Sequence, residues 1–224
     1  MQKASFFYEK LDKINSLVSN KPFIEKEITD DKEKKRLIDE LFKTKLPDDT
    51  LFAHFKIKIF KPYSIYDYYI IDDKKMVKTR NVVLVKNGKP VVKMNYAIKF
   101  VCGIEYVEDS YSIYCQNSNY LEERITRKML NSDTFSKMDI SILESNDNDY
   151  FLNSYELYYS NRELSAIKSK DNMSLATENS CLLMQEIIDD KFNTINNKFD
   201  NSIENNLGME STNIYHIKHN RVSK

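Results

Sequence analysis

Glycine is unusually scarce: the 224 residues contain only Gly88, Gly103 and Gly208. Loops that cradle phosphate, dinucleotide-binding folds and the sharp turns that carry a nucleophilic serine all need glycine for close backbone approach or positive φ. The scarcity disfavours these enzyme classes. We therefore expect a protein that is not an enzyme and that holds no cofactor.

Cysteine and histidine are also too few to suggest a metal site or a disulfide framework. Cys102, Cys115 and Cys181 are widely spaced, and no CxxC motif occurs. His216 and His219 have no further Cys or His nearby in the sequence to complete a zinc site. We expect no bound metal.

Long apolar runs are absent, and the mean hydropathy is −0.58. No run approaches the roughly 18 apolar residues of a membrane span, so we expect no membrane partner. Charges at Glu9 and Lys10 interrupt the N-terminus before a signal-peptide core can form, so we expect no secretion through a signal peptide. With 41% hydrophobic residues, the chain has enough apolar material for a core.

The charges sum to zero but are zoned. Residues 50–100 carry eleven basic and three acidic side chains, whereas residues 101–200 carry nine basic and eighteen acidic ones. Opposite zones can steer a partner or meet the opposite zone of another copy. We expect a homo-oligomer, a ring with head-to-tail contacts. The alternative is a monomer in which the two zones neutralise one another.

The first 46 residues predict two helices. Their apolar stripes are Phe7, Leu11, Ile14 and Val18 in one segment and Leu37, Ile38, Leu41 and Phe42 in the other. Pro22 ends the first helix, since the residue before a proline is pushed out of the α region. Asp30 with Glu33 three residues later predicts a capping box at the start of the second helix.

Residues 47–117 predict an antiparallel β-meander of four to six strands. Residues 51–60 alternate between apolar and polar side chains, as a half-buried strand does. Asn87-Gly88 is a strong hairpin signal, because both central residues of a type I′ turn need positive φ. We expect this meander to be apolar on one face and rich in lysine on the other.

Residues 118–204 predict a C-terminal helical part. Leu121, Ile125 and Met129 recur at spacings of four, whereas 132–171 is ambiguous. An aromatic patch over 150–159 predicts a short helix. A narrow stripe from about Thr177 predicts one long amphipathic helix against a neighbouring helix. Residues 205–224 predict a polar tail that becomes ordered on another subunit.

The predicted fold class is therefore α+β. It comprises an N-terminal helical pair (1–46), a central antiparallel β-meander (47–117) and C-terminal helices ending in the long amphipathic helix (118–204). A polar tail extension (205–224) follows.

Two groups of residues are candidates for interaction. The lysine-rich face of the meander comprises Lys56, Lys58, Lys86, Lys89, Lys93 and Lys99. The predicted subunit contacts are Tyr155, Tyr158, Tyr159, Ile188, Phe192, Ile195 and Phe199. Nucleic-acid binding by the lysine face is possible but not favoured, because arginine makes the bidentate phosphate and base contacts and this zone contains only Arg80.

One enzyme signature has a partial match. Pro47-Asp48, followed by Asp72-x-Lys74, resembles the PD-(D/E)xK nucleases, in which two carboxylates hold magnesium and the lysine assists an attacking water. That family places the second acid and the lysine within a strand. Here they belong to a charged quartet, 72–75, that predicts a turn. We therefore favour the turn.

The residue usage also suggests a source. The chain has 28 Lys against 6 Arg, with 22 Asn and 15 Tyr, as do proteins from very AT-rich genomes. In composition, though not in any motif, it resembles virion proteins of AT-rich bacteriophages such as the crAss-like phages. Parasites and some large viruses share this usage. The resemblance implies a structural assembly protein, such as a connector, ring or tail subunit, that contacts other particle proteins in the virion or host cytoplasm. The alternative is a regulatory or anti-defence protein that binds a host factor.

Overall fold

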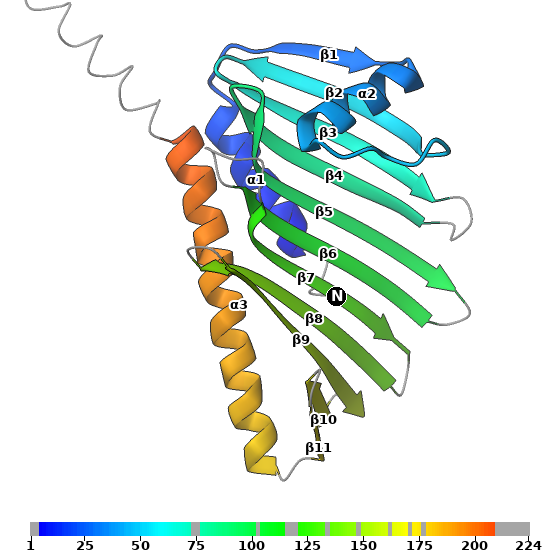
Figure 1. Cartoon of the computed structure of the whole chain (residues 1–224), viewed down its shortest axis with the longest axis vertical. Helices are drawn as coiled ribbons and strands as arrows, with labels where there is room; N and C mark the ends of the chain where they lie inside the picture. Colours follow the sequence, from blue (N-terminus) through cyan, green and yellow to red (C-terminus); the bar gives the residue numbers. More distant parts are fainter. Residues whose placement is uncertain are drawn as a thin grey trace, which may run out of the picture.

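A single antiparallel sheet of eleven strands dominates the computed structural model, and each strand pairs with the strand before it in the sequence (Figure 1). The structure describes residues 5–72, 77–101, 104–114, 121–132, 135–146, 149–160, 163–169, 172–175 and 178–208. The strands are β1 (Ile24–Ile28), β2 (Leu51–Phe60), β3 (Tyr63–Asp72), β4 (Val77–Lys86), β5 (Lys89–Val101), β6 (Ile104–Tyr114), β7 (Leu121–Asn131), β8 (Phe135–Asn146), β9 (Asp149–Ser160), β10 (Glu163–Ser169) and β11 (Asn172–Leu175). The helices of these residues are α1 (Ser5–Val18), α2 (Asp31–Phe42) and α3 (Glu178–Leu207).

Both faces of the sheet carry helices. On β4, Val82 and Leu84 pack in the core beneath α1 and α3, whereas Val83 and Val85 pack in the core beneath α2. Successive residues of a strand point to opposite faces, so α2 lies on the face opposite α1 and α3. Figure 1 shows α2 in front of the sheet and α1 behind it.

The helices α1 and α3 pack side by side on one face. The predicted α1 stripe is buried, and it shares a core with Phe199, Ile203 and Leu207 from the end of α3. Lys10 Nζ lies 2.5 Å from Asp200 Oδ2, and this ion pair joins the two helices. The first half of α3 covers β7–β10 through a separate core that includes Ile188 and Ile195.

The local signals for α2 and for the β4–β5 hairpin are confirmed. The Asp30 side chain accepts a hydrogen bond of 2.7 Å from the Glu33 backbone N–H, which caps α2. Asn87 and Gly88 have φ of 51° and 75°, the positive values that a type I′ turn requires. Residues 73–75 of the charged quartet lie outside the described residues, but β3 and β4 pair on either side of them.

The predicted α+β class is wrong, because the sheet dominates the molecule. The expected N-terminal helical pair is divided: β1 separates α1 from α2, and the two helices lie on opposite faces. The boundary expected at 117 falls between β6 and β7, which are neighbours in one sheet. The predicted meander therefore continues through most of the segment expected to be helical.

The segment 121–129 shows why the helix prediction failed there. Ile125 and Met129 are buried on β7 beneath α3. A spacing of four is even, so it places residues on one face of a strand as well as on one stripe of a helix. Pairing with the neighbouring strands β6 and β8 makes this segment a strand and not a helix. The local sequence pattern carries no information about those neighbours.

Two further expectations change with the fold. The 150–159 segment is strand β9 rather than a short helix. Residues 205–207 belong to α3, and the rest of the predicted tail, from 209 onward, lies outside the described residues. None of the helices in the described residues combines the length and apolar character needed to span a bilayer.

Candidate binding surface

The open face is the face of β6–β10 opposite α3. No helix of the described part of the chain lies over it, because α2 packs against β1, β2 and β5 and α3 packs on the other side. Antiparallel register places directly opposite residues on the same face, so the open face consists of rows that cross the strands. Three of these rows differ in chemistry.

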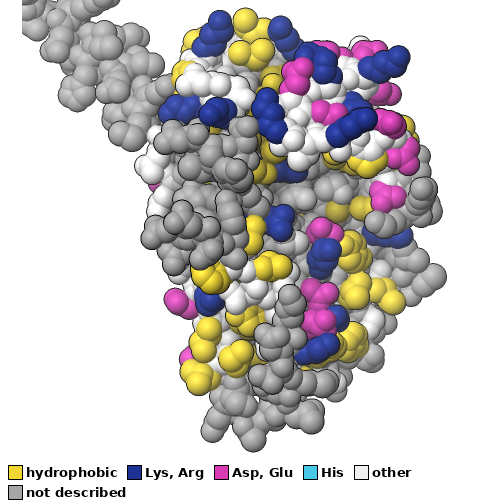
Figure 2. Space-filling view, in the orientation of Figure 1, with side chains coloured by type: hydrophobic (Ala, Val, Ile, Leu, Met, Phe, Trp, Pro, Cys, Tyr) yellow, Lys and Arg dark blue, Asp and Glu magenta, His cyan; other side chains and the backbone are white. Residues whose placement is uncertain are grey.

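The first row is a charge ladder. Its members, from β6 to β10, are Glu108, Lys128, Asp139, Glu156 and Lys168, each opposite the next. Figure 2 shows a column of acidic and basic side chains on this side of the molecule, below α2. Lys137, one row away, lies 3.0 Å from Asp139 and 3.3 Å from Glu156. Every cation of this ladder thus has a carboxylate neighbour.

Tyrosine hydroxyls complete the charge ladder. Tyr106 donates to Glu108, and Tyr158 donates to Glu156. The Tyr158 hydrogen bond and the Lys137 ammonium lower the pKa of Glu156 below its usual value. Glu156 therefore stays charged at neutral pH.

The second row consists of hydroxyl side chains. Ser110, Thr126, Ser141 and Ser154 lie opposite one another on β6–β9. Thr126 donates to Ser110 over 3.2 Å, and the Ser141 and Ser154 hydroxyls are 3.3 Å apart. These short side chains form a flat polar strip beside the charge ladder.

The third row extends from the open face onto β5 and contains a pair of cations. Lys93 on β5 and Arg124 on β7 each lie directly opposite Ser112 on β6. The Lys93 ammonium lies 4.9 Å from the centroid of the Phe42 ring at the end of α2. Burial, and then the positive charge of Arg124, lower the pKa of Lys93 to about 8. Among the described residues, no carboxylate forms an ion pair with either cation.

Exposed apolar side chains flank the ladder. Leu130 is 38% exposed and Phe135 is 45% exposed. Leu130 lies opposite Tyr106 and Lys137, and the rings of Phe135 and Tyr158 are 6.3 Å apart. A charged strip beside apolar side chains is typical of a protein interface, with polar groups for register and apolar ones for affinity.

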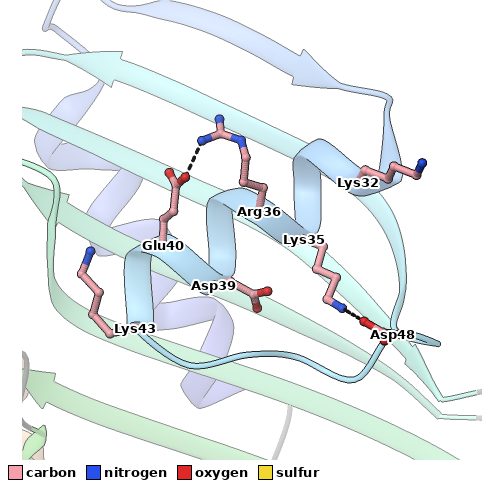
Figure 3. Close-up of a pocket in the computed structure, with 7 residues that line it drawn as sticks. All are labelled: Lys32, Lys35, Arg36, Asp39, Glu40, Lys43 and Asp48. Carbon is pink, nitrogen blue, oxygen red and sulfur yellow. Dashed lines mark hydrogen bonds and ion pairs between the residues drawn. The ribbon is translucent and has the colours of Figure 1, made fainter.

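The hollow on the outer side of α2, about 660 Å³, is a weaker candidate (Figure 3). It is lined by Lys32, Lys35, Arg36, Asp39, Glu40, Lys43 and Asp48. Lys35 pairs with Asp48, and Arg36 pairs with Glu40 over 2.5 Å. Asp39 accepts from the Leu46 backbone N–H over 2.7 Å. The carboxylates that line this hollow thus already have ion-pair or hydrogen-bond partners within the chain.

The partial nuclease match is only partly assembled in space. Pro47 and Asp72 line one hollow of about 550 Å³ beside the start of β2 and the end of β3. Asp48 instead pairs with Lys35 beside α2, and Lys74 lies outside the described residues. Within the described residues, no three His, Cys, Asp or Glu side chains gather as a metal site requires, and His216 and His219 lie outside them.

The predicted lysine face is divided between the two faces of the sheet. Lys56, Lys58 and Lys86 lie opposite Asp67, Ile65 and Tyr63, in rows that include the core beneath α1 and α3. Lys93 and Lys99 lie on the α2 side of β5, and Lys89 is exposed beside the hairpin turn. The meander is apolar on both faces, so the expected single basic face does not form.

The predicted subunit contacts are also redistributed. Tyr155 and Tyr159 pack beneath α3, whereas Tyr158 lies on the open face. The α3 stripe of Ile188, Phe192, Ile195 and Phe199 packs against the chain's own sheet. The neighbouring helix that this stripe meets is α1 of the same chain, at Phe199.

Most of the open face is not predictable from the sequence. Met138, Ile140 and Ile142 alternate with Lys137, Asp139 and Ser141, which is the period-two signal of a half-buried strand. That signal identifies β8 but not its neighbours. Lys93, Ser112 and Arg124 lie in one row because of the register in which β5, β6 and β7 pair. Lys93 and Arg124 are 31 residues apart in the sequence, so no local pattern shows that they are neighbours.

No family model, curated protein or solved structure matches this chain. The function is therefore argued from the open face itself.

Proposed function

We propose that this chain is a non-enzymatic assembly subunit that binds a second copy of itself through the open face. The observation that carries the proposal is the order of charges in the ladder, which is acidic, basic, acidic, acidic, basic from β6 to β10. This order is nearly self-complementary when reversed. Its place in a virus particle remains a prediction from composition.

A two-fold axis parallel to β8 reverses the strand order between two facing copies. Glu108 then faces Lys168 of the second copy, and Lys128 faces Glu156 of the second copy. Asp139 meets its own counterpart at the axis. Lys137, 3.0 Å from Asp139, supplies positive charge there. Four of the five positions are thus matched, and the fifth has its own cation.

The size of the open face suits such a contact. Strands of 11 or 12 residues such as β7–β9 are about 37 Å long, and five strands span about 24 Å. This rectangle of about 900 Å² is comparable with the roughly 800 Å² per partner of a standard interface. The axis also brings Leu130 opposite Tyr158 of the second copy, which adds apolar contact beside the charges.

The proposal replaces the expected head-to-tail contact with a two-fold one. A head-to-tail contact uses two different surfaces, whereas the ladder matches itself. The basic and acidic sequence zones lie side by side in one sheet, β2–β5 and then β6–β10.

Sedimentation of the full chain tests the proposal. We expect a dimer at low salt that dissociates as salt rises, because charges at an accessible interface are screened. Lys128→Glu and Glu156→Lys should each give a monomer, since each places like charges opposite one another. Lys26→Glu makes the same charge change on exposed β1 and should leave the dimer intact.

Mixing the two monomeric variants provides the decisive measurement. A Lys128→Glu chain opposite a Glu156→Lys chain restores attraction at both pairs, so an equimolar mixture should form a heterodimer. The Lys128→Glu/Glu156→Lys double variant should dimerise for the same reason. A wild-type monomer at low salt, or no heterodimer in the mixture, would overturn the proposal.

A further inference from the structure

Lys93 and Arg124 differ from the other cations of the same face. Lys128, Lys137 and Lys168 each lie within 4 Å of a carboxylate. In the described residues no such partner is present for Lys93 or Arg124, although Ser112 places them two strands apart on one row. Two strand spacings separate their backbones by about 10 Å. Their flexible side chains can therefore converge on one ligand.

The surroundings of Lys93 favour a charged ligand. The Phe42 ring stacks beside the Lys93 ammonium, and the rings of Phe42 and Tyr114 are 5.8 Å apart. These rings exclude water from one side of Lys93 and leave Arg124, which is exposed, on the other. A partly desolvated ammonium beside a second cation gains more from a bound anion than a fully hydrated one does.

The donors define the chemistry of that anion. Lys93 offers three N–H groups, and Arg124 offers a planar fork of five. Ser112 lies between them, and its hydroxyl is hydrogen-bonded to Tyr114. Two positive charges match a doubly charged tetrahedral oxyanion better than a singly charged carboxylate. Arginine binds such groups bidentately.

We infer that Lys93, Ser112 and Arg124 form a binding site for a phosphate-class oxyanion, beside the end of α2. The site lies at β5–β7, toward the edge of the surface that the proposed function assigns to a second copy. It rests on the unneutralised cations and not on the charge ladder. Either proposal can therefore fail while the other stands.

Titration of the full chain with inorganic phosphate at constant ionic strength tests the site. We expect saturable binding by calorimetry, weakened at least about tenfold by Arg124→Gln and by Lys93→Met, because each removes a charge-assisted hydrogen bond. Lys191→Gln removes a cation of α3, on the opposite face, that already pairs with Glu144, and should bind phosphate as the wild type does. Arg124 is exposed, so its variant keeps the fold.

Proton uptake gives a second readout that a non-specific charge effect would not produce. The charged group that lowers the pKa of Lys93 is Arg124 on β7; the Phe42 ring of α2 lies beside the Lys93 ammonium, and the Tyr114 ring of β6 lies beside Phe42. A bound anion raises that pKa, so binding at pH 8.5 should take up protons, measured in buffers of different ionisation enthalpy. Lys93→Met should abolish the uptake.

Two results would overturn the inference. Acetate binding as tightly as phosphate would contradict a site for a doubly charged oxyanion. Equal loss of phosphate affinity in Lys191→Gln and Arg124→Gln would show general electrostatic attraction to the chain instead of a site. Sedimentation of Arg124→Gln, run in parallel, separates loss of the anion site from loss of self-association.

Discussion

Asp109 and Arg127 lie directly opposite one another on β6 and β7 and are joined by two parallel hydrogen bonds. Arg127 Nε donates to Asp109 Oδ1 over 3.1 Å, and Nη2 donates to Oδ2 over 2.5 Å. Asp109 is 1% exposed, and the Arg127 guanidinium lies 5.6 Å from the Phe192 ring of α3. The pair thus ties the open part of the sheet to the helix behind it.

Replacing Asp109 should destabilise the fold strongly. Asp109→Asn leaves the Arg127 guanidinium beneath α3 without its carboxylate, and losing one partner of a buried ion pair costs about 3 kcal/mol or more. Urea unfolding measures this loss. Asp67→Asn is the matched control, because the Asp67–Arg80 pair has the same bidentate geometry but Asp67 is 32% exposed. Equal losses in both variants would contradict the role of burial.

Removing the Tyr68 hydroxyl should not destabilise the protein. Tyr68 is fully buried between α2 and the sheet, and its hydroxyl has no hydrogen-bond partner among the residues that the structure describes. Tyr68→Phe removes that unsatisfied group and keeps the ring stacked on Phe55, so we expect a gain of about 1 kcal/mol. Tyr111→Phe is the control, because its hydroxyl lies 3.4 Å from Asp109 and its removal should cost stability. A loss in Tyr68→Phe equal to that in Tyr111→Phe would count against this account.

The β4–β5 turn should tolerate asparagine better than alanine at position 88. Gly88 has φ of +75° and open space where a Cβ would lie, so any cost there is backbone strain and not a clash. Gly88→Ala should lower the free energy of unfolding by about 1 kcal/mol, and Gly88→Asn by less, because asparagine enters the left-handed region more readily. Thermal unfolding of the two variants decides; equal values would be inconsistent with strain.

Lys93 should make stability depend on pH. Its pKa is lowered from 10.5 to about 8, so between these values the unfolded chain binds more protons than the folded one, and stability rises with pH. The full shift amounts to about 3 kcal/mol at most, a penalty present below pH 8 and lost by about pH 10.5. Lys93→Met removes it, so the variant's advantage over the wild type should shrink between pH 7 and 10.

The measured quantity is the difference in unfolding free energy between Lys93→Met and the wild type, because tyrosine ionisation affects both proteins alike. In an Arg124→Gln background the pH-dependent part should be smaller, because the charge that helps to lower the Lys93 pKa is absent. A constant advantage across this pH range would argue against the lowered pKa.

Elements with complete local signals could be predicted. The helix α1 has its stripe and Pro22, α2 has the Asp30 cap, and the β4–β5 turn has Asn87-Gly88. In each case the interactions that form the element lie within a few residues of one another. Strand β7 had no such signal, because the spacing of Ile125 and Met129 fits both kinds of structure.

The sequence by itself determined the zoned charge, the scarcity of glycine and the places where the chain turns. Tertiary structure decided which face each side chain occupies. Lys56 and Lys93 each lie on the polar side of their own strand, yet they point to opposite faces of one sheet. The reason is that β2 buries Phe55 and Ile57 beneath α2, whereas β5 buries Val92 and Met94 beneath α1 and α3. Which helix covers a strand depends on residues far away in the chain. The alternation of apolar and polar residues within the strand therefore cannot predict it.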